Sequence, residues 1–248
     1  MKGLWAWAQG PQVWPQRQPE PQSLLACCGW EQVPPRCSQC QGPIRPGAWG
    51  TGKGHLSEQR PGWLWCCSPC AHRAVQVADV PRLHATVASF LQQHLHLRMA
   101  DWLGAHQVHL VGPQGWAMPC RLTGHPATAR KLGEARTQVR RQPHRLVHAE
   151  VRVLRGLPFV SAAAVLVHEA FHVYSASQGL GLSRVQEEGT ANLWAYLMLT
   201  VMPGNPLAEQ ERLRLLHDDD AVYGQGFRDA RVLYKQVGGF GAYMRAVA

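Results

Sequence analysis

The chain has 248 residues, a formal net charge of +9 and a pI near 9.5, which favours acidic partners, anionic surfaces or nucleic acid. It holds no uninterrupted run of 18 apolar residues, so we expect no membrane-spanning segment. The first residues lead into tryptophans, prolines and glutamines without an apolar signal-peptide core, so we expect a cytoplasmic protein in a reducing compartment.

Residues 1–34 contain five prolines and six glutamines. This composition is typical of a linker or a poorly ordered tail. The tail also carries Trp5, Trp7, Trp14 and Trp30, and nothing in the sequence decides whether they dock onto the body or onto a partner.

Seven of the eight cysteines lie before residue 71. Two Cys-x-x-Cys pairs, Cys37/Cys40 and Cys67/Cys70, are separated by 26 residues, a spacing that suits a closed tetrahedral Zn²⁺ site of the zinc-ribbon or half-LIM kind. The sequence therefore predicts a structural zinc module over residues 35–72. Its ligand set stays open, because the neighbouring residues Cys66, His72 and His55 are further thiol and imidazole candidates.

The third segment, residues 80–248, is expected to fold as a domain of its own. Apolar residues at helical spacing predict a helix over 80–99, and residues 107–111 and 145–154 are strand-like. Residues 145–154 are the candidate for a sheet edge against which an extended substrate could pair, and the alternative is an ordinary half-buried strand. Residues 113–144 are basic and turn-rich and predict a loop over the cleft.

Residues 162–178 predict a buried helix, with Ser161 as its N-cap and Gly179 as its stop. Within it, His168 and His172 stand four residues apart, so both imidazoles project from one face. That spacing allows both to bind one Zn²⁺ with a third protein ligand and a water. Glu169 lies beside the open position and can take a proton from the water. A buried helix with two histidines and a glutamate must pair these groups, and the alternative to a metal is a core helix whose histidines are satisfied by hydrogen bonds.

The third ligand should come from the next helix, predicted over 185–199. Glu188 is the preferred ligand, because the following Gly189 would leave room for close approach to the metal helix. Glu187 remains the alternative, since adjacent carboxylates at a helix start cannot be separated by spacing alone. Asn192 lies four residues after Glu188, on the same face, and could hydrogen-bond a ligating histidine.

Three further helices are expected downstream, over 207–216, 221–237 and 240–247, and the Asp218–Asp220 run predicts a helix N-cap. His217 and Tyr223 are candidate donors to the oxyanion that forms when a peptide carbonyl is attacked.

The stretches Val151–Pro158, His168–His172, Glu187–Gly189 and Tyr223–Arg228 resemble the DA-one family, LIM-domain-associated zinc peptidases known from plant organ-size control, with bacterial relatives. In the order strand, Gly-Leu-Pro, metal helix and Glu-Glu-Gly helix, the resemblance covers roughly residues 85–248. It implies an α+β, zincin-like fold of the gluzincin type, with His168, His172 and the glutamate of Glu-Glu-Gly on zinc and Glu169 as general base. The family also places a LIM-like module before the peptidase.

We therefore expect a zinc metallopeptidase that acts on protein or peptide substrates and holds two Zn²⁺ ions, one catalytic and one structural. Its rival is a zinc-ribbon protein that binds nucleic acid or protein and whose helical part is structural. The positive charge supports this alternative. A binding protein, however, has no need of a His-Glu-x-x-His motif on an apolar helix.

Overall fold

The computed structural model describes residues 74–111 and 132–247. The predicted tail and the predicted zinc module, with Cys37, Cys40, Cys67 and Cys70, lie outside this part. The described residues mix helices with one small sheet, which confirms the α+β class. Its elements are η1 (Val77–Asp79), α2 (Val80–Phe90), η2 (Leu91–Leu95), η3 (Met99–Asp101), η4 (Ala105–Gln107), β1 (Val108–Val111), β2 (Gly133–Arg141), β3 (His144–Leu154), α3 (Phe159–Gln178), α4 (Arg184–Thr200), α5 (Pro206–Leu216), α6 (Tyr223–Val237) and α7 (Phe240–Val247).

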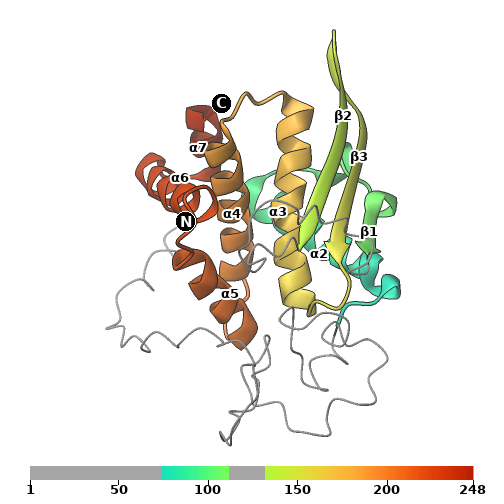
Figure 1. Cartoon of the computed structure of the whole chain (residues 1–248), viewed down its shortest axis with the longest axis vertical. Helices are drawn as coiled ribbons and strands as arrows, with labels where there is room; N and C mark the ends of the chain where they lie inside the picture. Colours follow the sequence, from blue (N-terminus) through green and yellow to red (C-terminus); the bar gives the residue numbers. More distant parts are fainter. Residues whose placement is uncertain (1–73, 112–131, 248) are drawn as a thin grey trace, which may run out of the picture. The chain divides into compact units, whose positions relative to one another are not determined.

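The sheet has three described strands in the order β1-β3-β2 (Figure 1). β3 runs parallel to β1 and antiparallel to β2, and Val151 and Val153 on β3 are fully buried. Two expectations are corrected. The strand before the metal helix is central rather than at the edge, and the C-terminal part of the predicted 113–144 loop is β2. The edge facing α3 is therefore provided by β2.

The helix α3, which carries His168 and His172, begins at Phe159, three residues before the expected start. Pro158 precedes it with an extended backbone, and the carbonyl of Pro158 accepts from the Ala162 amide. Ser161 is therefore not the N-cap; its hydroxyl donates to Glu211 on α5 instead, at 2.8 Å. Gly179 ends α3 in the left-handed region with φ of 67°, as predicted.

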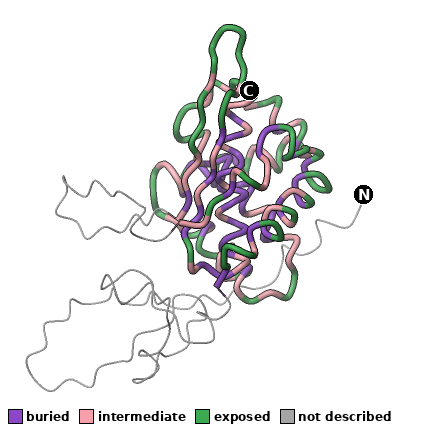
Figure 2. The backbone as a smooth tube through the Cα atoms, turned by 90° about the vertical axis from the view of Figure 1, so that its right-hand side faces the viewer, coloured by how far each residue is buried: buried purple, intermediate pink, exposed green. Residues whose placement is uncertain are grey.

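α3 lies in the core between the sheet and α4, and α4 is in turn covered by α6 (Figures 1 and 2). Gln178 is the one exposed residue of the helix, which confirms that it is buried nearly all round. Its length and mean hydropathy would also allow a membrane span, and 56% of that stretch is buried inside the fold. Packing against β2, β3 and α4 accounts for its apolar composition without a membrane.

Ser183 is the N-cap of α4, and its hydroxyl and backbone exchange hydrogen bonds with Gln186. α4 crosses α6 at two glycines, Gly189 and Gly226. The two helices are so close there that a Cβ on Gly189 would overlap the backbone of Gly226. The expected reason for Gly189 was therefore wrong: this glycine admits α6, not the metal helix. A Cβ on Gly226 would likewise collide with the carbonyl of Val185.

The remaining helix predictions hold with shifted ends. The helix expected over 80–99 stops at Phe90 and continues as the wider turn η2, after which His96 adopts a left-handed backbone. The helices α5, α6 and α7 lie where 207–216, 221–237 and 240–247 were predicted. Asp220 serves the predicted capping role, since its carboxylate accepts from the amides of Val222 and Tyr223.

Candidate metal centre

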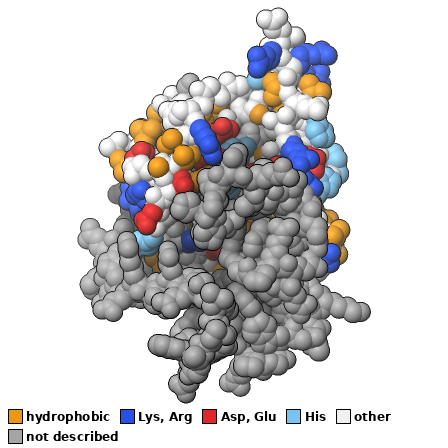
Figure 3. Space-filling view, in the orientation of Figure 1, with side chains coloured by type: hydrophobic (Ala, Val, Ile, Leu, Met, Phe, Trp, Pro, Cys, Tyr) orange, Lys and Arg blue, Asp and Glu red, His pale blue; other side chains and the backbone are white. Residues whose placement is uncertain are grey.

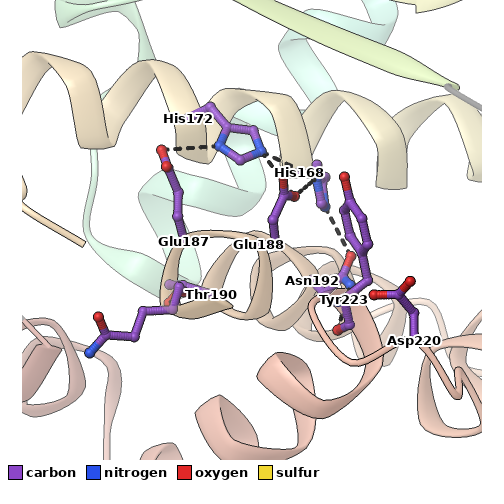
Figure 4. Close-up of polar contacts among 9 residues, drawn as sticks. His168, His172, Glu187, Glu188, Thr190, Asn192, Asp220 and Tyr223 are labelled. Carbon is purple, nitrogen blue, oxygen red and sulfur yellow. Dashed lines mark hydrogen bonds and ion pairs between the residues drawn. The ribbon is translucent and has the colours of Figure 1, made fainter. Parts of the chain in front are cut away.

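His168 and His172 point their imidazoles to one place between α3 and α4 (Figure 4). Their Nε2 atoms are 3.3 Å apart. The helical spacing of four residues produces this convergence, as the sequence predicts.

The outer nitrogens of both rings are held by side chains of α4. Nδ1 of His168 donates to Oδ1 of Asn192 at 2.9 Å, and Nδ1 of His172 donates to Oε1 of Glu187 at 3.2 Å. The amide group of Asn192 is itself oriented, because its Nδ2 donates to the carbonyl of Tyr223. Because both Nδ1 atoms hold their protons in these contacts, each ring, once neutral, presents the lone pair of Nε2 to the same point.

Glu188 completes the set. Its Oε2 lies 3.3 Å from Nε2 of His168 and 3.5 Å from Nε2 of His172. This oxygen is buried and accepts no hydrogen bond from any residue in the described part of the chain. An unpaired buried carboxylate oxygen is costly unless a cation compensates it.

The three separations fit one tetrahedral ion. Ligand atoms at the usual Zn–N distance of about 2.0–2.1 Å stand about 3.3–3.4 Å from one another on a tetrahedron. The observed separations are 3.3, 3.3 and 3.5 Å. The group could therefore hold a metal ion with little rearrangement. The geometry also favours Glu188 over Glu187 as third ligand, because Glu187 contacts the outer nitrogen of His172.

Glu169 lies on the sheet side of the centre and is 8% exposed. The backbone amide of Ala135 on β2 hydrogen-bonds its carboxylate. Gly133, two residues earlier, is needed for this approach, because a Cβ there would stand 2.6 Å from both Cγ of Glu169 and Cγ1 of Val165. The sequence reasoning missed this role of β2, and only the glycine at 133 marks it in the sequence.

Burial and mutual charge set the proton affinities of the site. Burial is the main cause that raises the pKa of Glu169, although the nearby imidazoles oppose the shift. For His172, burial disfavours the charged ring, but the hydrogen bond to Glu187 and the nearby carboxylate of Glu188 outweigh it and raise the pKa to about 10. Burial of Glu188 is likewise outweighed by the two imidazoles, which hold its pKa well below the usual range.

Of the two expected oxyanion donors, the structure brings only Tyr223 to the centre. Figure 4 shows the Tyr223 side chain beside His168 and Glu188, with its hydroxyl directed toward α3. Burial and the charge of Glu188 raise the Tyr223 pKa, while a hydrogen bond from Arg184 lowers it. His217 stands at the C-terminal end of α5 and does not line the cleft described next.

These groups open into a cleft of about 1030 Å³ between β2 and the helices α3, α4 and α5. Seven acidic residues of the described part line it: the three at the centre and Glu134, Glu211, Asp218 and Asp220 around them. Arg214 is the one Lys or Arg among the described lining residues. The cleft is therefore negative in a chain of net charge +9, and its field attracts cations.

Comparison with known proteins gave no further assignment: no protein-family model, no curated protein and no solved structure matches the chain.

Proposed function

We propose that the protein is a zinc-dependent peptidase of the gluzincin type with a zincin-like catalytic domain. The observation that carries the proposal is the buried Oε2 of Glu188, which makes no hydrogen bond with the described residues and stands at tetrahedral-edge distances from two imidazole nitrogens. The His-Glu-x-x-His and Glu-Glu-Gly motifs and their resemblance to the DA-one family support the same assignment. The second, structural zinc at Cys37, Cys40, Cys67 and Cys70 remains part of the proposal.

A zinc ion bound at this centre would supply Lewis-acid chemistry, which lowers the pKa of water to about 7 and polarises a carbonyl. His168, His172 and Glu188 hold the ion, while Asn192 and Glu187 keep both rings in the ligating tautomer. Glu169 accepts the proton of the attacking water and passes it to the leaving amine, and burial, which raises its pKa, makes its carboxylate a stronger proton acceptor. The hydroxyl of Tyr223 donates to the developing oxyanion.

The outer edge of β2 suits an extended substrate. β2 pairs with β3 on one side, and no described strand pairs with its other side. The amide of Ala135 points to that open side, since it reaches Glu169. A peptide added along this edge would pass the metal ligands with its backbone hydrogen-bonded to β2.

Counting bound zinc tests the metal centre. We expect His168→Ala to lose one zinc per chain relative to the wild type when dialysed protein is analysed by elemental mass spectrometry. His148→Ala, which removes an exposed histidine of β3, should keep the wild-type count. An equal zinc content in His168→Ala and wild type would reject the site. The fold of each variant is checked by circular dichroism.

A further inference from the structure

The β2–β3 hairpin extends beyond the body of the described fold, and its far end is exposed (Figures 1 and 2). From residue 135 to 149 it contains four arginines and no acidic residue. Figure 3 shows the basic side chains gathered at this end. Arg136 is bound to Glu134 at 3.0 Å, which leaves Arg140, Arg141 and Arg145, here called the tip arginines, as the charged groups of the far end.

The tip arginines have no compensating partner among the described residues: their side chains are exposed and make no ion pair there. Arg140 and Arg145 also stand directly opposite each other on the paired strands. Like charges in that relation destabilise a hairpin. A small cavity of about 230 Å³ lies at the pair, lined also by Leu146 and Val147, and the Val147 side chain is 62% exposed. A negatively charged partner with some apolar surface would relieve the repulsion.

The tip is continuous with the cleft through β2. Gly133, Glu134, Ala135 and Thr137 line the cleft, and the same open edge continues to Arg140. Three residues of strand separate Thr137 from Arg140, or about 10 Å. A chain paired antiparallel to β2 runs from the tip toward the metal centre, so its N-terminal part lies at the tip arginines.

We propose that the tip arginines bind an acidic segment of the protein substrate, located on the N-terminal side of the bond to be cleaved. This inference rests on the proposed peptidase function. The acidic segment must end at least about three residues before the part held in the cleft. Closer to the cleft, the carboxylates that line it would repel the acidic segment. A polypeptide fits this surface better than nucleic acid does. The open edge of β2 runs from the tip to the cleft, and an extended peptide backbone can pair with it along that whole length.

Peptide binding to the full chain tests the proposal without requiring catalysis. The protein is zinc-loaded Glu169→Gln, and the probes are two fluorescein-labelled peptides that share eight neutral residues and begin with four glutamates or four glutamines. We expect the glutamate peptide to bind about 3- to 20-fold more tightly in fluorescence anisotropy, from two or three exposed charge pairs. Added salt should reduce the difference.

The variant Arg140→Gln/Arg145→Gln should remove most of that preference. The matched control is Lys235→Gln/Arg245→Gln, which deletes the same charge from exposed positions on α6 and α7 and should keep it. Equal binding of both peptides, or a preference unchanged in the tip variant, would overturn the proposal.

A single-stranded oligonucleotide serves as the alternative probe. If it binds through the tip arginines while the glutamate peptide shows no preference, the surface recognises nucleic acid and the proposal is rejected. Failure of zinc-loaded wild type to cleave any peptide would instead reject the peptidase function, and the binding comparison would still decide the docking site.

Discussion

At the scale of single residues, hydrogen bonds to Asn192 and Glu187 orient the two imidazoles of the proposed metal centre. His168 and His172 could be placed on one face from sequence, because four-residue spacing on a helix fixes their relation. Asn192 was placed by the same rule on α4, and its 2.9 Å contact with His168 confirms it. Glu187 and Glu188 could not be told apart, since their roles depend on how α4 is rotated against α3.

Asn192→Ala should weaken zinc binding at the centre by about 10- to 100-fold. The substitution removes the acceptor that fixes the Nδ1-protonated tautomer of His168. Asn192→Asp keeps an oxygen at this position that can accept the hydrogen bond from His168, so this variant should retain more of the zinc affinity. Competition with a chromophoric chelator measures both constants. Equal affinity of Asn192→Ala and wild type would show that the tautomer does not need this contact.

Zinc affinity should depend on pH well above the ordinary range of histidine. The pKa of His172 is raised to about 10, so without metal its ring is protonated at pH 8 and zinc must displace that proton. Affinity should therefore rise about tenfold per pH unit between pH 7.5 and 9, with one proton released per ion. Calorimetry in buffers of different ionisation enthalpy counts the protons. A flat profile over this interval would contradict the raised pKa.

At the scale of elements, helices were easier to predict than strands. The apolar composition of α3 and the glycine at 179 that ends it are local features of the sequence, and they predict the helix. β2 has no apolar alternation in Gly-Glu-Ala-Arg-Thr-Gln-Val-Arg-Arg, and it is a strand because β3 pairs with it. β3 is the central strand and not the expected edge, because it pairs with β1 on one side and with β2 on the other. The contact of Gly189 with Gly226 joins residues far apart in sequence, which no local spacing reveals.

Gly189→Ala should destabilise the fold by about 1–3 kcal/mol, as overpacking does at a close helix crossing. The added Cβ meets the backbone of Gly226, so α6 must shift and carry Tyr223 with it. Gly181→Ala is the control, because a Cβ there meets nothing within 4 Å. Urea unfolding gives the free energies. If Gly189→Ala is as stable as the control, the two helices do not cross as closely as described.

At the scale of the whole molecule, overall charge gave a partial view. The value of +9 suggests anionic partners, whereas the cleft gathers seven carboxylates of the described residues, and the three tip arginines stand at the end of the hairpin. Charge separation of this kind follows from the fold, since the cleft carboxylates come from β2, α3, α4, α5 and the segment before α6. The metal-binding motif and its chemistry could be proposed from the sequence. The direction in which a substrate would run could not, because it depends on the direction of β2, which the sequence did not predict as a strand.

Digestion of a proteome-derived peptide library by zinc-loaded wild type and Glu169→Gln tests the central claim most directly. Glu169→Gln keeps His168, His172 and Glu188 but removes the base. Mass spectrometry should find new termini with wild type, lost on chelation and restored by zinc, and formed at least about 100-fold more slowly by the variant. Equal cleavage by both proteins, or no cleavage by wild type with its zinc in place, would contradict the account.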